Sequence, residues 1–201
     1  MTKRFWGLGI ALLTMAPMGL VHGQPNDERA KKIIGASCFL CHGAEGESAS
    51  PVFPRLAGQN AEYVAKQLEN FKSGQRKSTA MASMVSELSS EDMRTLGQFF
   101  ASRPPHKEAP QDAGLAVVGG YLYQNGNKHS GVPACIACHG PDAAGSATLP
   151  RLAGQFAAYL ENQLKLFSKR ERNNDNAVMH SVAEKMTAQE MAAVAEYLSG
   201  K

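Results

Sequence analysis

Residues 38–43 read "CFLCHG": two cysteines are separated by two residues, and a histidine directly follows the second. A C-x-x-C pair is typical of three kinds of site, namely a redox-active disulfide, half of a zinc site, or an attachment point for haem. The adjacent His42 favours haem, but a match of five residues does not exclude the other two. The rest of the sequence must therefore distinguish among the three.

The motif occurs twice in the chain. "CFLCHG" returns as "CIACHG" at residues 135–140, an offset of 97 residues. Three further segments recur in the same order: "PRLAGQ" at 54–59 and 150–155, "YVAKQLENF" at 63–71 with "YLENQLKLF" at 159–167, and "MASMVSELSSEDM" at 81–93 with "MHSVAEKMTAQEM" at 179–191. Because the order is kept and the offset stays between 96 and 98 residues, the chain contains a duplicated domain.

The N-terminal stretch "MTKRFWGLGIALLTMAPMGLVHGQ" has the organisation of a secretory signal peptide. Two basic residues precede an apolar run, and small side chains then lead to a cleavage site near Gly23. The alternative is an uncleaved membrane anchor, but Pro17 interrupts the apolar run, which is short for a span of about 20 residues. We therefore predict that residues 1–23 are a signal peptide and that the mature protein, from about Gln24, lies in the periplasm.

Composition narrows the classes of partner. The 201 residues carry 21 Lys and Arg against 18 Asp and Glu, and losing Lys3 and Arg4 lowers the formal charge from +3 to +1. No long basic run suggests nucleic acid, so no nucleic-acid partner is predicted. Four cysteines in an exported protein would ordinarily indicate two disulfides, and this alternative has to be weighed against haem.

A proline-rich stretch, "ASRPPHKEAPQDAG" at 101–114, separates the two copies. Its three prolines exclude a continuous helix and favour an extended connector. We place the first domain at 24–103, the linker at 104–112 and the second domain at 113–201. Each half is small for a core of its own, so a large apolar cofactor in each would complete the core.

Each half is predicted to be all-α, with about three to four helices around its cofactor. Tyr, Leu and Phe recur at helical spacing, with charges between them, in residues 61–73 and 157–168. Ser89 and Thr187, each with an acidic residue three positions later, are typical N-caps of a terminal helix. Further helices are expected before the two cysteine pairs, at about 27–36 and 112–124.

The sequence C-x-x-C-H is the attachment signature of c-type haem. Thiols three positions apart lie on one face of a helical turn, so both can form thioethers with the vinyl groups of one porphyrin. Zinc would need four N or S ligands, a redox pair would lie in a βαβ unit, and a disulfide within C-x-x-C closes too short a loop to stabilise much. We therefore predict two covalent haem c groups, attached through Cys38, Cys41, Cys135 and Cys138, with iron ligands His42 and His139.

The sixth ligand of each iron determines the function, and the candidates are a histidine, a methionine or none. Met81 and Met179 coincide in the repeats and lie 39 and 40 residues after their respective histidines. Met84 competes with Met81, but its counterpart is Val182, so the repeat favours Met81. A methionine is by default a core residue. This spacing, however, leaves room for one helix and a loop that returns to the opposite face of the haem.

Taken together, the C-x-x-C-H motifs, the twin "PRLAGQ" segments and the matched methionines resemble those of the dihaem cytochromes c4. These are periplasmic proteins with two tandem class I cytochrome c domains, and the resemblance covers essentially the whole mature chain. It implies His/Met ligation at both irons, by His42 with Met81 and by His139 with Met179.

The resemblance also assigns roles to two prolines and two arginines. The carbonyl oxygens of Pro54 and Pro150 would accept the Nδ1–H of the ligand histidines and so orient the imidazoles. From the residues alone, these prolines are equally well explained as turn formers. Arg55 and Arg151 are identical between the copies and are candidates for contacts with haem propionates, or else ordinary surface charges.

An iron with two strong protein ligands has no vacant position, which favours electron transfer over catalysis. We therefore predict an electron carrier, not an enzyme, acting between a membrane quinol-oxidising complex and a terminal oxidase or other periplasmic acceptor. Peripheral association with the membrane is left open. One alternative is the cytochrome subunit of a flavoprotein or dehydrogenase complex. Another is a dihaem peroxidase, against which the two matched methionines argue.

Overall fold

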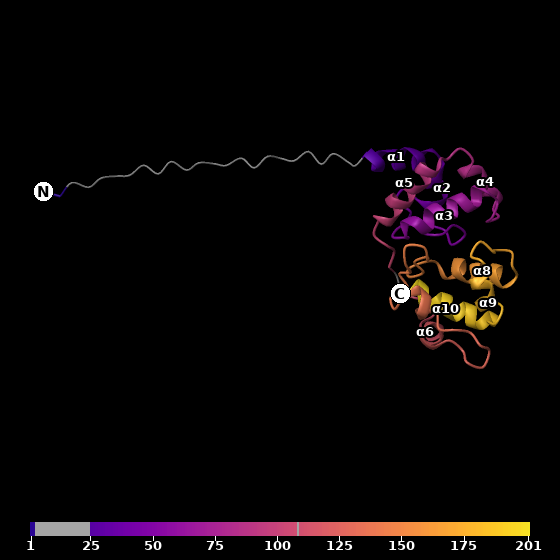
Figure 1. Ribbon diagram of the computed structural model, residues 1–201. Coiled ribbons are helices and arrows are strands. Elements are labelled where there is room, and N and C mark those ends of the chain that lie inside the picture. The colour runs from indigo at the N-terminus through magenta and orange to yellow at the C-terminus, as the bar shows by residue number, and fades with distance from the viewer. Residues whose placement is uncertain (3–24, 108) are drawn as a thin grey trace.

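The computed structural model describes residues 1–2, 25–107 and 109–201. The predicted signal peptide, residues 1–23, therefore lies almost wholly outside the described residues. The described chain is helical, and the pair Asn127 and Val132 forms its one isolated β-bridge. The predicted all-α class is thus confirmed. Figure 1 shows the helices in two groups, one from each half of the chain.

The helices of the two halves follow one another in the same order. In the first half they are α1 (Pro25–Ile33), the π-helical segment η1 (Ile34–Cys38), α2 (Phe39–His42), α3 (Ala61–Lys72), α4 (Thr79–Val85) and α5 (Ser90–Ala101). In the second half they are α6 (Ala113–Asn125), α7 (Ile136–His139), α8 (Ala157–Ser168), α9 (Val178–Ala183) and α10 (Ala188–Ser199). The expected helices at 61–73 and 157–168 are α3 and α8.

The two halves differ in how the chain enters the cysteine pair. In the first half, α1 continues through η1 directly into α2, beyond the expected end near residue 36. In the second half, α6 ends before Gly126, whose φ of 66° is left-handed and which packs against the Val132 carbonyl oxygen. A loop that contains the isolated bridge then leads to Cys135. Only the second half therefore separates its entry helix from its cysteine motif.

Both predicted N-caps are confirmed. The Ser89 hydroxyl accepts a hydrogen bond from the Asp92 backbone N–H, and the Asp92 carboxylate accepts one from the Ser89 N–H. Thr187 and Glu190 make the same reciprocal pair at the start of α10. An N-cap of this kind contributes about 1 kcal/mol to helix stability.

Each half packs its terminal helix against its entry helix and its central helix. Helix α5 contacts α1 and α3, and α10 contacts α6 and α8. The buried apolar residues of the first half form two separate clusters, one around Leu96 and Phe99 and one around Phe71 and Met93. Those of the second half form a single cluster that includes Tyr123. The two clusters of the first half share Leu68 and Leu88 as partly buried neighbours, whereas the second half has one larger cluster.

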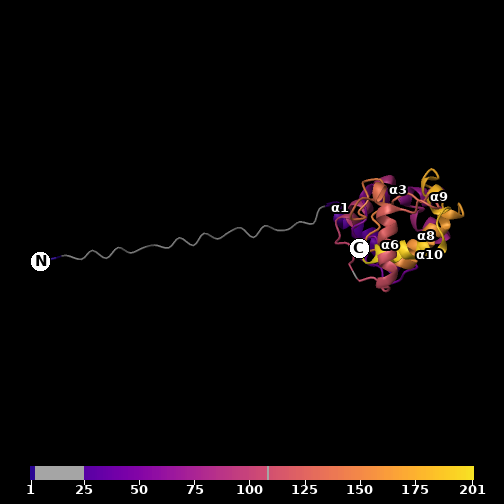
Figure 2. The same ribbon diagram turned by 90° about the horizontal axis from the view of Figure 1, so that it is seen from below.

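Helices α6 and α10 cross each other (Figure 2), and Gly119 lies at this crossing, against Ala193. A Cβ added at this position would overlap the backbone carbonyl oxygen of Ala193, so only glycine permits the two helices to approach this closely. Gly114, on the same helix, is exposed, and an added Cβ there would meet nothing closer than ordinary van der Waals contact.

This pair of glycines gives a matched stability test. Gly119→Ala is expected to lower the free energy of unfolding by about 1–3 kcal/mol because the backbone of α10 must move. Gly114→Ala is expected to raise it by about 0.5–1 kcal/mol through helix propensity. Urea unfolding followed by circular dichroism measures both. Equal effects of the two substitutions would contradict the close crossing.

The linker lies against both halves. Residues 104–107 and 109–112 form no helix. Pro105 packs on Gly58 of the first half, the His106 carbonyl oxygen packs on Gly154 of the second, and Pro110 packs on Gly200. Each of these glycines gives the described part of the linker room to approach the domain surface.

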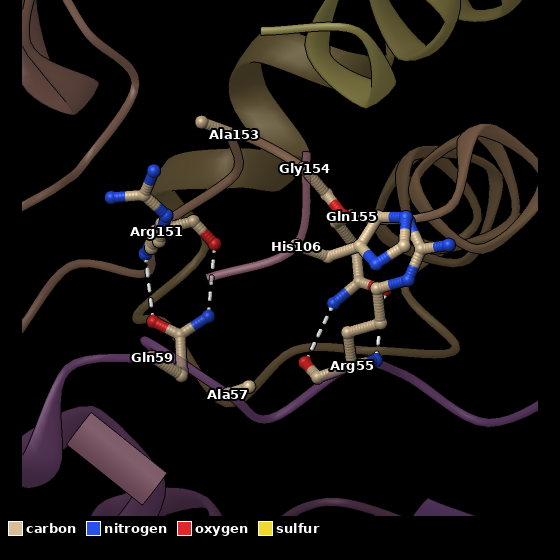
Figure 3. A pocket seen from close by; sticks show the side chains of 8 residues that line it. All are labelled: Arg55, Ala57, Gln59, His106, Arg151, Ala153, Gly154 and Gln155. Carbon is tan, nitrogen blue, oxygen red and sulfur yellow. Dashed lines mark hydrogen bonds between the residues drawn. The ribbon is translucent and has the colours of Figure 1, made fainter. Parts of the chain in front are cut away.

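The two "PRLAGQ" segments face each other across the domain interface and exchange hydrogen bonds reciprocally (Figure 3). The Gln155 side chain receives a hydrogen bond from the Arg55 N–H at 3.0 Å and donates one to the Arg55 carbonyl oxygen at 2.9 Å. Gln59 pairs with the backbone of Arg151 in the same way, at 2.7 and 2.9 Å. These four bonds relate the halves by an approximate two-fold axis and fix their relative position.

Candidate functional site

The two cysteine motifs fold alike. In each, the first cysteine immediately precedes a one-turn helix, α2 or α7, and the histidine is the last residue of that helix. A glycine with left-handed φ, Gly43 at 80° and Gly140 at 78°, then ends the helix. The chain therefore turns away directly after each histidine, and both histidines keep a buried position.

The histidines are held in one orientation. His42 is 7% exposed and His139 is 8% exposed. The Nδ1 of His42 lies 2.9 Å from the Pro54 carbonyl oxygen, and the Nδ1 of His139 makes a longer contact of 3.4 Å with that of Pro150. Because a carbonyl only accepts, Nδ1 carries the proton and Nε2 keeps its lone pair. Burial lowers the pKa of both imidazoles, which favours the neutral form that binds metals.

All four cysteine thiols are unpaired in the structure. Cys38, Cys41 and Cys135 are half-buried and Cys138 is exposed, and none forms a disulfide. Across the described chain, no three His, Cys, Asp or Glu side chains group as a metal site. The arrangement therefore supplies two thiols and one imidazole in each half, as covalent haem attachment requires.

The two predicted axial methionines occupy corresponding places. Met81 lies on α4 and Met179 on α9, and each is half-buried against the apolar cluster of its own half. The backbone N–H of Met81 is capped by the Ser78 hydroxyl and that of Met179 by the Asp175 carboxylate. Met84, the competing candidate in the first half, is 47% exposed. The packing therefore favours Met81 over Met84.

The predicted propionate-binding arginines lie at the domain interface. Arg55 is buried, stacks on the ring of Phe156 at 3.6 Å and donates from Nη1 to the Gly154 carbonyl oxygen at 2.8 Å. Arg55 therefore reaches into the opposite half. The Nε of Arg151 is buried without a hydrogen-bond partner among the described residues. A carboxylate would satisfy that donor, so Arg151 fits an acidic group of a haem.

Sequence reasoning missed the interface residues. Gln59 and Gln155 hydrogen-bond the two "PRLAGQ" segments to each other. These two residues and their neighbours also line a small cavity beside His106 (Figure 3). Arg76 and Arg172 make a second set of contacts between the halves. The signal available in the sequence was that each pair is identical in the two copies, Gln59 with Gln155 and Arg76 with Arg172.

Comparisons with known proteins agree with this arrangement. A family model described as "Cytochrome c oxidase, cbb3-type, subunit III" matches residues 25–100, and one described as "Cytochrome c" matches residues 123–200. Cytochrome c4 from Azotobacter vinelandii is 38% identical over 202 residues, covering 94% of this chain and 95% of that protein. A thiosulfate dehydrogenase electron acceptor from Thiomonas intermedia is 37% identical over 196 residues, covering 94% and 90%.

A solved structure shows the same fold. The crystal structure of reduced recombinant cytochrome c4 from Pseudomonas stutzeri superimposes with a TM-score of 0.82 at 34% identity, covering 87% of this chain and 97% of that chain. With one C-x-x-C-H motif in each of two cytochrome c domains, the chain carries two covalent haem c groups, attached at Cys38 and Cys41 and at Cys135 and Cys138. No helix in the described part of the chain is both long enough and apolar enough to cross a bilayer.

Proposed function

Because the chain belongs to the cytochrome c4 family of electron-transfer proteins, we propose that it carries electrons in the periplasm from a membrane quinol-oxidising complex to a terminal oxidase or another redox acceptor. The observation that carries this proposal is the matched donor set of the two halves. Each half has a buried histidine oriented by a proline carbonyl and a half-buried methionine on a short helix.

We propose that His42 and Met81 ligate one iron and that His139 and Met179 ligate the other. Bound haem supplies an iron centre that accepts and releases one electron. The chain's own residues fix the imidazole orientation through Pro54 and Pro150 and surround the methionines with apolar side chains. A thioether ligand favours the reduced iron relative to a second imidazole, and two strong ligands leave no position for a substrate.

The location in the periplasm rests on the N-terminal sequence. The basic start, the apolar run and the small residues before Gly23 predict export and cleavage. Export also places the two cysteine pairs in the compartment where a c-type cytochrome functions. We therefore propose a mature chain that starts near Gln24.

A second candidate partner follows from the comparisons. The Thiomonas intermedia relative is a thiosulfate dehydrogenase electron acceptor, and its similarity to this chain extends over nearly the full length of both. We propose that a dehydrogenase of this class is an alternative electron donor. Donor and acceptor complexes would be recognised by local surface patches, because the polypeptide is close to neutral overall once residues 1–23 are removed.

The test is a set of spectra and a reduction assay on the purified mature protein. Intact mass should correspond to a chain starting near Gln24 plus two haem groups. The oxidised protein should show the weak charge-transfer band of methionine-ligated haem, and the reduced protein should not bind carbon monoxide. Stopped-flow reduction by quinol-oxidising membranes, compared with reduction by thiosulfate dehydrogenase and thiosulfate, identifies the donor. Rapid turnover of peroxide by the intact protein would contradict an electron carrier.

A further inference from the structure

Two arginines related by the duplication meet at the domain interface. Arg76 precedes α4 and Arg172 precedes α9, so each lies on the segment that leads to the proposed axial methionine of its half. Arg172 is only 8% exposed and Arg76 is half-buried. In Figure 1 the central helices α3 and α8, which carry the partners of both arginines, lie on the facing sides of the two halves.

Each arginine bonds to both halves at once. Arg76 donates from Nη1 to Gln67 at 2.8 Å, and from Nη2 to Gln163 and to the Tyr159 hydroxyl of the other half, both at 3.0 Å. Arg172 mirrors this pattern with its own glutamine and the opposite tyrosine: it donates to Gln163 at 2.7 Å, to Tyr63 at 2.8 Å and to Gln67 at 3.2 Å. The two cations thus share both glutamine oxygens.

The partners of this pair are all neutral. Within the described residues, neither Arg76 nor Arg172 takes part in an ion pair with a carboxylate. Placing two like charges beside each other in a largely buried interface is unfavourable unless negative charge compensates them. Glutamine and tyrosine oxygens orient guanidinium groups but do not neutralise them. Within the described residues, the network therefore places two positive charges at the interface without a negative charge to compensate them.

Each cation also contacts the apolar cluster against which the proposed axial methionine of its half packs. The Arg76 guanidinium stacks on Phe71 at 4.6 Å, and that of Arg172 stacks on Phe167 at 4.5 Å. Phe71 belongs to the apolar cluster that contacts Met81, and Phe167 to the one that contacts Met179. One aromatic ring therefore lies between each positive charge and the apolar cluster that the proposed axial methionine of its half contacts.

We propose that Arg76 and Arg172 act as one counter-charge shared by the two haem groups, which raises the reduction potentials of both and couples them across the interface. The inference rests on the two haem groups and on the axial methionines of the proposed function. Reduction of each iron from Fe(III) to Fe(II) takes up one electron and so adds one negative charge to its pocket. A buried positive charge nearby stabilises the reduced form, and each haem also brings two propionate groups that need compensation.

The test is a spectroelectrochemical titration of the purified dihaem protein and its variants. Arg76→Gln and Arg172→Gln should each lower the potentials of both haems, with the larger shift in the half that carries the substitution. Arg76→Lys keeps the charge but loses the planar guanidinium, whose two terminal nitrogens bond to Gln67 and to Gln163 and Tyr159 at once. It should leave the potentials close to those of the parent protein while lowering the midpoint of unfolding.

Lys66 provides a matched control. It is exposed on α3, next to Gln67, so Lys66→Gln removes the same charge from the surface. Its effect on the potentials should be small and should disappear at about 1 M salt, where the Debye length is about 3 Å. The shifts caused by Arg76→Gln and Arg172→Gln should persist at that salt concentration, because a buried pair is poorly screened.

If an arginine variant fails to fold, Gln67→Glu tests the same proposal. It keeps both arginines and the acceptor oxygen but adds a negative charge, so the potentials should fall while the interface stays closed. Unchanged potentials in Gln67→Glu, or equal shifts in Arg76→Lys and Arg76→Gln, would overturn the shared counter-charge. The haem count and the methionine band of the parent protein are measured on the same samples. If those are absent, it is the proposed function that fails.

Discussion

Replacing Cys38 and Cys41 together by serine is expected to leave one covalent haem per chain instead of two. A thioether needs a sulfur atom, and a serine hydroxyl does not replace it. Mass spectrometry under denaturing conditions should therefore show the loss of one haem, and the haem absorbance per chain should fall by about half. The second motif is unaffected because its thiols, Cys135 and Cys138, lie in the other half.

Loss of the first haem should also destabilise the first half more than loss of the second haem destabilises the second half. The first half has two separate apolar clusters, whereas the second has one continuous cluster. A small domain buries a low fraction of its surface, so losing a large apolar cofactor lowers its stability. The control is Cys135→Ser with Cys138→Ser, which should remove the other haem and leave more residual helix in circular dichroism. Two haems remaining on either double variant would contradict the attachment sites.

The helices that could be predicted from the sequence are those whose own residues specify them. Tyr, Leu and Phe at helical spacing identified α3 and α8, and serine or threonine followed by an acid three residues later identified the starts of α5 and α10. These features are local: an apolar face and a side-chain cap determine where a helix lies regardless of what surrounds it.

The entry helix of the first half could not be placed as well because its end depends on tertiary contacts. The helix was expected only to precede the cysteine pair, with its end near residue 36, and Gly35 and Ser37 are poor helix formers. In the structure the helix continues through η1 to Cys38, because Ala30 and Ile34 are buried against α5. Packing thus overrides propensity at this point.

The contacts between the two halves could not be predicted from the sequence at all, and the reason is again physical. Gln59, Arg76 and their counterparts are polar residues that would be solvated on an isolated domain. Periodicity within one copy does not reveal that the same surface of the other copy covers them. Arg55 illustrates the point: its ring partner, Phe156, comes from the other half, where the first copy has Asn60. Only the packing of two duplicated domains brings such residues together.

Met81→Ala is expected to remove about half of the methionine–iron charge-transfer band and to open one iron to carbon monoxide. Alanine carries no donor atom. The other ligand, His42, is held by the Pro54 carbonyl oxygen and should stay in place. The potential of this haem should fall because the thioether that favours the reduced form is lost. Absorption spectra of the oxidised protein, and carbon monoxide titration of the reduced protein, measure the two effects.

Met84→Ala is the matched control, since it removes the same side chain three residues further along α4. Met84 is 47% exposed, so its loss should change stability by no more than about 0.5 kcal/mol and leave the band intact. Met179→Ala should remove the other half of the band, because Met179 is the proposed ligand of the second iron. If Met84→Ala and not Met81→Ala reduced the band, the ligand would lie one helical turn further on, and the repeat would no longer be symmetric at the iron.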